Sequence, residues 1–186
     1  AIELKPDYAN AYFNLGNTLK EVSKLEEAEK FYRKAIELKP NYANAYFNLG
    51  NTLKEVSRLE EAERFYRKAI EFKPDYANAY FNLGNTLREL YKLQEAETFI
   101  RKAIEFKPDY LEAHNSLGNS QRKLGKFREA IESYNKAIEL KPNSFELYYN
   151  IANSFKDLRK FDEAIEIYNK ALKINPNAAN VYYSLG

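Results

Sequence analysis

The sequence predicts an all-α solenoid of antiparallel helical hairpins, and three observations lead to this prediction. The prolines stand at positions 6, 40, 74, 108, 142 and 176, so every interval is 34 residues. Residues 9–42 and 43–76 differ at only four of their 34 positions. Within each copy, apolar residues recur at the spacing of one helical face. A fixed period of this length is typical of stacked helical repeats, each of which buries its apolar face against its neighbours.

Each repeat is expected to contain two helices. The first runs from about the second residue of the repeat to LKE, and the second runs from LEEAEKFYRKAIELK to the proline. Proline ends a helix because it has no N–H and its ring clashes with the preceding turn. The Asp or Asn after each proline is expected to cap the next helix. In the first copy the predicted buried residues are Tyr12, Leu15, Gly16 and Leu19 in the first helix and Ala28, Tyr32, Ala35 and Leu38 in the second.

Composition narrows the class of protein. The chain has 186 residues, of which 45% are hydrophobic and 15% aromatic, and this is enough apolar surface to argue against disorder. Lys and Arg (29) nearly balance Asp and Glu (27), so no basic field attracts nucleic acid or anionic lipid. No apolar run approaches the roughly 18 residues that a membrane span needs. No membrane or nucleic-acid partner is therefore expected.

Other absences indicate cellular location and origin. The chain has no cysteine and no Asn-x-Ser/Thr sequon, which favours an intracellular, cytoplasmic protein. No signal peptide opens the chain. It also has no methionine, so we expect it to be a piece of a longer protein.

The repeated pattern resembles the tetratricopeptide repeat (TPR) family. An aromatic residue is followed by Leu-Gly three and four positions later, then by Ala, an aromatic residue, Ala and Pro. The resemblance implies a right-handed superhelical solenoid. It departs from the family pattern at His114 and Ile100, which replace aromatic residues, and at Ala152, which replaces glycine. The expected repeats are 9–42, 43–76, 77–110, 111–144 and 145–178, with 1–8 as the end of a preceding second helix and 179–186 as the start of a sixth repeat.

Asparagines recur on the first helix of each repeat. They share one face, opposite the buried stripe, and the TPR resemblance places this face on the concave surface. An amide offers two donors and an acceptor, which complement the C=O and N–H of a peptide unit. First helices about 10 Å apart match three residues of extended chain at about 3.3 Å each. The predicted peptide-binding residues are Asn10, Asn14, Asn17, Asn44, Asn48, Asn51, Asn78, Asn82, Asn85, Asn119, Asn150 and Asn153.

A closer resemblance supports this prediction. The segment NLGNTLKE is similar to the repeats of O-linked N-acetylglucosamine transferases, whose asparagine ladder holds the backbone of protein substrates. The ladder positions correspond to Asn14, Asn48, Asn82 and Asn150, with Ser116 as a gap. The chain is thus expected to be a protein-interaction module for an extended peptide, or the substrate-recognition arm of a larger enzyme such as a glycosyltransferase.

Three alternatives remain open at this point. The asparagines could simply bond neighbouring helices or water, since near-identical repeats copy every residue. An RNA-binding helical repeat would show strong salt dependence, but the balanced charge speaks against it. Finally, the two ends should expose repeat-stacking surface, which would allow head-to-tail self-stacking of molecules.

Further residue columns have structural and functional interpretations. Phe13, Phe47 and Phe81, with Asn115, Tyr149 and Tyr183, could contact a ligand, but we predict that they pack against the adjacent repeat. Because Phe13 stands where a carboxylate clamp has lysine, no such clamp is expected. Lys20, Lys54, Arg88, Arg122 and Lys156 line up beside Glu21, Glu55, Glu89 and Asp157, and the surface is expected to turn basic only near Arg122 and Lys123.

The remaining polar residues suggest no chemistry. Glu29 and Arg33, like Glu26 and Lys30, have i,i+4 spacing and are expected to form solvated pairs. His114 is expected to pack in the core, and one histidine without cysteine cannot build a zinc site or a catalytic triad. The carboxylates do not converge on a pocket. We therefore expect this segment to have no catalytic residues, metal or cofactor.

Overall fold

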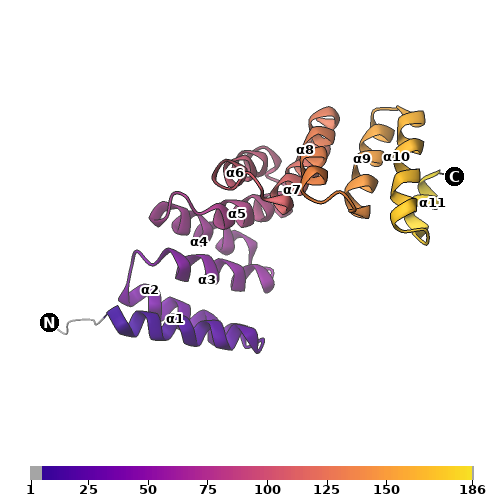
Figure 1. The fold of residues 1–186 in the computed structure, drawn as a ribbon. Coiled ribbons are helices and arrows are strands. Elements are labelled where there is room, and N and C mark those ends of the chain that lie inside the picture. Colours follow the sequence, from indigo (N-terminus) through magenta and orange to yellow (C-terminus); the bar gives the residue numbers. More distant parts are fainter. Residues whose placement is uncertain (1–5, 186) are drawn as a thin grey trace. The chain divides into compact units, whose positions relative to one another are not determined.

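The computed structural model describes residues 6–185, and every element in this part of the chain is a helix (Figure 1). The helices begin and end where the sequence period predicts to within a few residues. Their bounds are α1 (Pro6–Glu21), α2 (Leu25–Leu38), α3 (Ala43–Glu55), α4 (Leu59–Phe72), α5 (Ala77–Glu89), α6 (Leu93–Phe106), α7 (Leu111–Lys123), α8 (Phe127–Leu140), α9 (Phe145–Asp157), α10 (Phe161–Ile174) and α11 (Ala179–Leu185).

The chain divides into two compact units, Ala1–Lys92 and Leu93–Gly186. In the first unit, α1 packs on α2 and α3 packs on α4, while α3 also contacts α2 and α5 contacts α4. In the second, α7 pairs with α8 and α9 with α10, with α6 against α7 and α11 against α10. The prediction of an all-α chain of consecutive packed helices is confirmed.

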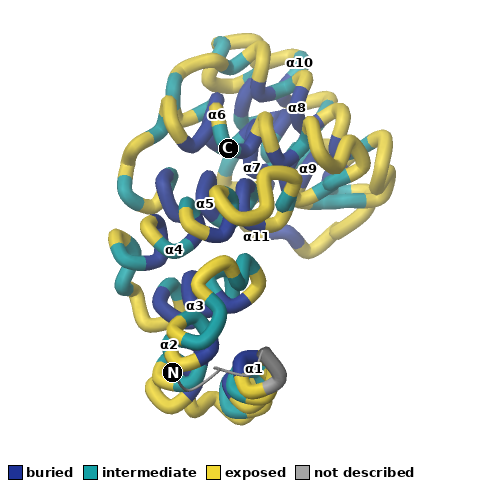
Figure 2. The backbone as a smooth tube through the Cα atoms, turned by 90° about the vertical axis from the view of Figure 1, so that its left-hand side faces the viewer, coloured by how far each residue is buried: buried dark blue, intermediate teal, exposed yellow. Residues whose placement is uncertain are grey.

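Each unit buries the predicted apolar stripe between its helices (Figure 2). Leu49, Leu83 and Tyr66 are fully buried, whereas Leu15 at the equivalent position of the first repeat is 42% exposed. The difference arises because α2 packs against α3, and α4 against α5, while no described helix precedes α1. The burial prediction is therefore wrong for Leu15.

Glycine permits the closest approach within a hairpin. A Cβ added to Gly50 would lie 2.7 Å from Cε1 of Tyr66, and one added to Gly118 would lie 2.5 Å from Cε1 of Tyr134. The tyrosine ring of the second helix thus occupies the space that a side chain on the first helix would need.

The helices of the repeats start differently from the sequence prediction. The N-cap of α3 is Tyr42, not Asn41, and its side chain makes no capping hydrogen bond. The ring of Tyr42 packs 5.0 Å from the ring of Phe13. Aromatic packing therefore positions the chain where it enters the helix, and the prediction of Asn and Asp caps is wrong; Tyr76, Tyr110 and Ser144 are the N-caps of α5, α7 and α9.

The turn inside each hairpin requires a left-handed backbone. Ser23, Ser57, Tyr91 and Arg159 have φ of 59–60°, and Gly125 has φ of 76°. Only glycine adopts this conformation without a steric cost, so four turns carry strain that the fourth repeat avoids.

The interpretation of residues 1–8 as the end of a preceding helix falls mostly outside the described residues. Pro6 is the first residue of α1, so residues 6–8 belong to the first helix of the first repeat. At the other end, residues 179–185 form α11.

Candidate functional site

The asparagines of the first helices occupy three equivalent positions in successive repeats, which we call the outer, middle and inner columns. The outer positions are exposed, the middle positions are half-buried on α3 and α5, and the inner positions of α1 and α3 lie next to the tyrosines of the second helices. We call the surface that these positions form on each unit the asparagine face. The outer column is Asn10, Asn44 and Asn78, the middle column is Asn14, Asn48, Asn82, Ser116 and Asn150, and the inner column is Asn17, Asn51, Asn85, Asn119 and Asn153.

In the first two repeats, a hydrogen-bonded chain links the inner asparagine to the core and to the next repeat. The hydroxyl of Tyr66 donates to Oδ1 of Asn51 at 2.8 Å, and Nδ2 of Asn82 donates to the same oxygen at 2.7 Å. Tyr32, Asn17 and Asn48 repeat the arrangement at 2.9 and 2.7 Å. Both lone pairs of the inner amide oxygen are thereby used within the molecule.

Burial keeps these tyrosines protonated. It raises the pKa of Tyr32 to about 12 and also raises the pKa of Tyr66 well above its ordinary value. The hydroxyl is therefore a donor at neutral pH. In this structure the hydroxyl donates, and the inner amide turns its oxygen toward the tyrosine and its nitrogen away.

In each linked pair of amides, one nitrogen and one oxygen remain without a hydrogen bond. Nδ2 of Asn17 and Asn51, and Oδ1 of Asn48 and Asn82, have no hydrogen-bond partner among the described residues. The exposed side chain of Asn44 makes no side-chain hydrogen bond within residues 6–185 either. The amides are thus neither all free nor all occupied, and each inner–middle pair leaves one donor and one acceptor.

The pattern changes at the third and fourth repeats. Asn85 is only 8% exposed, and its Oδ1 is buried without a hydrogen bond. The tyrosine position of that repeat is Ile100, which has no hydroxyl. In the middle column, Ser116 is buried, and Nδ2 of Asn150 donates to Asn115 Oδ1 at 3.3 Å instead of to Asn119.

The tyrosine bond itself persists in the second unit. Tyr134 donates to Asn119 Oδ1 at 2.8 Å, and Tyr168 donates to Asn153 Oδ1 at 2.7 Å. The inner asparagines of this unit therefore keep their orientation, although the link to the next repeat is different.

Two hollows open along the asparagine face of the first unit. One has a volume of about 370 Å³ and is lined by Asn17, Tyr32 and Asn48 together with charged residues. The next has a volume of about 340 Å³ and is lined by Asn51, Tyr66 and Asn82. Each hollow therefore contains one inner asparagine, one middle asparagine and the tyrosine that orients them.

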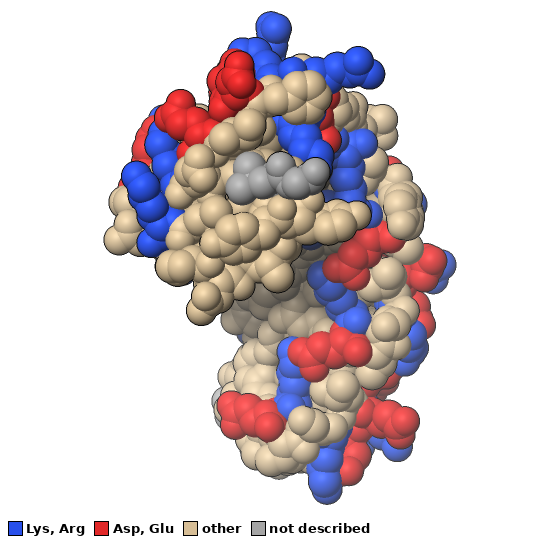
Figure 3. Space-filling view, turned by 90° about the vertical axis from the view of Figure 1, so that its right-hand side faces the viewer, with Lys and Arg blue, Asp and Glu red and all other residues tan. Residues whose placement is uncertain are grey.

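Charges beside the hollows are paired across repeats. Lys20 binds Glu55 at 2.8 Å, and Lys54 binds Glu89 at 2.9 Å. On the surface seen in Figure 3, acidic and basic side chains lie next to one another. In the second unit Arg122 binds Asp157 at 2.6 Å, so the expectation that the surface turns basic near Arg122 is wrong.

Phe13 and Phe47 pack, as predicted, although their aromatic partners lie in their own repeats and not in the adjacent one. The ring of Phe47 lies 4.8 Å from the ring of Tyr76 and 6.0 Å from that of Tyr66. Tyr149 lies 6.0 Å from Tyr168. At the end of the column Tyr183 is 90% exposed and follows neither pattern.

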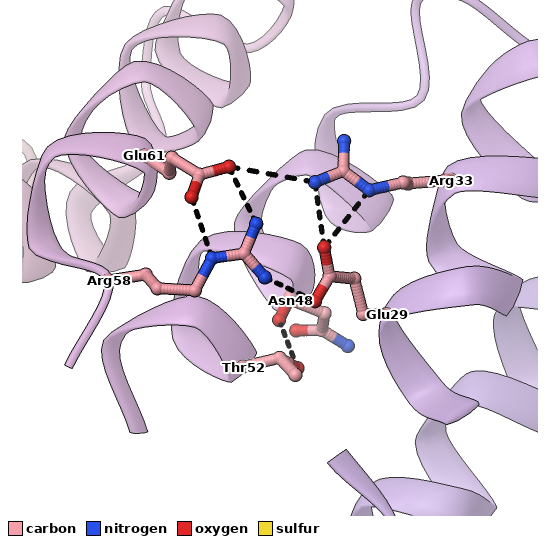
Figure 4. A network of polar contacts seen from close by, with 6 residues as sticks. All are labelled: Glu29, Arg33, Asn48, Thr52, Arg58 and Glu61. Carbon is pink, nitrogen blue, oxygen red and sulfur yellow. Dashed lines mark hydrogen bonds and ion pairs between the residues drawn. The ribbon is translucent and has the colours of Figure 1, made fainter. Parts of the chain in front are cut away.

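The predicted solvated pair of Glu29 and Arg33 is part of a network between repeats (Figure 4). Glu29 accepts from Arg33 of its own helix and from Arg58 of the next repeat, both at 2.7 Å. Arg58 also binds Glu61, and the side chain of Glu29 is only 16% exposed. The description of this pair as solvated is therefore wrong, because the carboxylate is partly buried and shared between repeats.

The same carboxylate position recurs in both units. Glu63 binds Arg67 and Lys92, both at 2.9 Å, and Glu97 is held in the same way in the second unit. Burial alone would raise the pKa of Glu63, but hydrogen bonds from Lys92 and Arg67 outweigh it and lower that pKa. The carboxylate is thus charged in the folded protein at neutral pH.

Residues 6–185 contain no cluster of three or more His, Asp or Glu side chains that could hold a metal ion. In the same part of the chain, no helix combines the length and the apolar character needed to cross a membrane.

Family models match nearly the whole chain. Models described as tetratricopeptide repeat match residues 9–42, 31–64, 77–110 and 145–178, and one described as TPR repeat matches 53–90 and 118–158. A comparison with curated proteins found no match.

Solved TPR proteins have the same fold. YrrB, described as a TPR protein with an unusual peptide-binding site, is 26% identical with a TM-score of 0.85, and the match covers 93% of this chain and 89% of YrrB. A structure of MamA is 24% identical with a TM-score of 0.88, and the match covers 95% and 96% of the two chains. MamA from Desulfovibrio magneticus RS-1 is 17% identical with a TM-score of 0.87, covering 92% of this chain and 97% of that one.

Proposed function

Because the chain belongs to the tetratricopeptide repeat family, we propose that it binds an extended polypeptide segment along the asparagine face. The peptide groups of that segment, and not its side chains, make the recurring contacts. Repeats of this family are protein-interaction modules, and the peptide-binding site described for YrrB supports a similar role here.

One observation carries the proposal. Asn51 and Asn82 are tied to each other, yet Nδ2 of Asn51 and Oδ1 of Asn82 have no partner among the described residues. These two groups complement the C=O and N–H of a peptide unit. Their orientation is already fixed by the Tyr66 hydroxyl, so a ligand would not have to order them. Asn17 and Asn48 offer the same pair one repeat earlier.

The paired charges beside the hollows support recognition of the backbone. Lys20 and Lys54 are neutralised by Glu55 and Glu89, so these cations do not select acidic ligands, and Glu21 adds one carboxylate without an ion pair among the described residues to the first hollow. A face of this kind would serve equally in an interaction module and in the substrate-recognition arm of a larger enzyme. In both cases this segment binds and does not catalyse.

The proposal can be tested with peptides selected from a random library displayed on phage. The affinity of a selected peptide is compared for the wild type, Asn44→Ala/Asn78→Ala and Asn48→Ala/Asn82→Ala. Loss of two hydrogen bonds should weaken binding by about 5-fold to 100-fold. The outer pair makes no side-chain hydrogen bond within the described residues, so its replacement should leave the unfolding temperature unchanged.

Asn135→Ala provides the matched control, because Asn135 is an exposed asparagine on the second helix α8. This variant should bind like the wild type. A selected peptide in which single peptide groups are N-methylated should lose affinity at about every third position. Unchanged affinity in both double variants would contradict the proposal.

A further inference from the structure

A hollow of about 610 Å³ opens in the second unit between α6, α7 and α8. None of the asparagines of the asparagine face lines it. Its apolar floor includes Leu117 of α7, which is 4% exposed, and Ile104 of α6. It is therefore a separate candidate binding site.

Comparison with the second repeat shows what opens this hollow. There, Tyr46 stacks on Phe65 with ring centroids 6.1 Å apart, and the guanidinium of Arg33 lies 5.2 Å from the centre of the Phe65 ring. Phe65 thus lies between Tyr46 of its own repeat and Arg33 of the preceding repeat.

The fourth repeat keeps the arginine of its preceding repeat but has histidine and serine in place of the two stacked rings. Two repeat lengths later, Arg101 stands at the position of Arg33, His114 at that of Tyr46 and Ser133 at that of Phe65. The imidazole Nε2 lies 2.9 Å from the carbonyl oxygen of Pro108, the same contact that the Tyr46 hydroxyl makes with Pro40. The backbone arrangement is therefore retained, and the space of one aromatic ring is left open beside Arg101.

Buried polar groups support this opening. Gln121 replaces the leucine of the earlier repeats and is 2% exposed, while Ser133 is 7% exposed. Ser133 Oγ lies 2.7 Å from the end of the Gln121 amide. Turned so that both of its ends find partners, this amide donates from its nitrogen to Ser133 Oγ and to the Glu129 carbonyl at 3.0 Å, while its oxygen accepts from Arg101 Nη2 at 3.0 Å. Glu97 holds Arg101 from the other side at 2.8 Å. The guanidinium is thus fixed at the edge of the hollow.

The rim carries unpaired negative charge. Glu105 and Glu132 both line the hollow, and neither forms an ion pair among the described residues. The cations at the hollow are already paired, Arg101 with Glu97 and Lys136 with Glu139. A ligand with a positive group next to its apolar part would therefore match this rim.

We propose that this hollow binds an aromatic side chain of a partner polypeptide, next to a basic residue of the same partner. The ring takes the place that corresponds to Phe65 of the second repeat. In this place it contacts the guanidinium of Arg101 and the imidazole of His114. The basic group meets Glu105 and Glu132. This site is independent of peptide binding along the asparagine face.

His114 gives the experiment a specific reporter, because it is the only histidine of the chain. The probe is the capped dipeptide Phe-Arg, titrated while the imidazole proton signals are followed by NMR. Saturable shifts are expected. The capped dipeptides Phe-Glu and cyclohexylalanine-Arg should each bind at least about 5-fold more weakly, the first through loss of the charge match and the second through loss of the aromatic face.

Three variants distinguish the proposed contacts. Ser133→Phe refills the missing ring and should abolish the shifts, whereas Ser133→Ala leaves the hollow open and should keep them. Glu105→Gln/Glu132→Gln changes only exposed residues, and it should remove the preference for Phe-Arg over Phe-Glu. The proposal is overturned if wild-type His114 does not respond to Phe-Arg, if folded Ser133→Phe responds like the wild type, or if the two dipeptides bind equally.

Discussion

The hydroxyl of Tyr66 donates a 2.8 Å hydrogen bond to Oδ1 of Asn51, while the ring of the same tyrosine is fully buried. One side chain therefore joins the core of the second repeat to its asparagine face. The amide orientation on that face depends on this contact, because nothing in an isolated helix would decide which end of the amide points inward.

Replacing Tyr66 by phenylalanine should leave the packing intact and remove only this bond. The expected loss of unfolding free energy is about 0.5–1.5 kcal/mol, measured by urea denaturation followed by circular dichroism. Tyr46→Phe is the control, because that hydroxyl bonds an exposed carbonyl of Pro40 at 3.2 Å and its loss should be smaller. Equal losses in the two variants would show that the Asn51 bond adds no more stability than the exposed bond to Pro40.

Gly50 cannot gain a branched side chain without moving Tyr66. Gly50→Val should destabilise the protein by about 1–3 kcal/mol, since a Cβ there would lie 2.7 Å from the ring. The fifth repeat has Ala152 at this position, opposite Tyr168. Ala152→Gly should therefore be milder and cost about 0.5–1 kcal/mol through helix propensity alone. Thermal unfolding of both variants checks the order.

A substitution at Gly125 tests the cost of backbone strain without a change in packing. Its φ is 76°, and a Cβ added to it would meet no atom within 4 Å. Gly125→Ala should therefore cost about 1–2 kcal/mol, all of it from the left-handed conformation. The reverse change, Ser57→Gly, should stabilise by a few tenths to about 1 kcal/mol. Opposite signs in urea denaturation are the expected result, and a neutral Gly125→Ala would contradict the assignment of strain.

Stability should fall in acid through Glu63 and Glu97. Burial opposes ionisation at both, but ion pairs lower the pKa of each carboxyl in the folded state. The unfolded chain therefore takes up protons first, so the contribution to stability is complete above the ordinary carboxyl pKa of 4.5 and is lost as pH falls through the lower folded pKa. Unfolding free energies measured between neutral and acidic pH should fall less steeply in Glu63→Gln/Glu97→Gln than in the wild type.

The helices and most of the buried stripe could be predicted because they depend on local periodicity. Leu49, Tyr66 and the packing of Phe47 follow from spacing within one repeat and its neighbour. The N-cap could not be predicted from residue type, since aromatic packing of Tyr42 took the place of a side-chain cap at Asn41.

Contacts between repeats were harder to predict from the sequence. Glu29 has one partner four residues away and another in the next repeat, and spacing along a single helix reveals only the first. The sequence did contain a clue to the amide orientation. The third repeat has Ile100 where the others have tyrosine. In that repeat the buried Asn85 oxygen has no hydrogen-bond partner. The hollow near Arg101 had a signal as well, because His114, Gln121 and Ser133 all depart from the earlier copies.

The shared carboxylates have a consequence for how the molecule comes apart. Glu63 forms ion pairs with cations of two successive hairpins. When one hairpin unfolds, its neighbour therefore loses an ion pair as well as apolar contacts. An interior break would forfeit such contacts on both sides, whereas melting from an end forfeits them on one. Hydrogen exchange should therefore show fraying that starts at the terminal helices and advances inward hairpin by hairpin.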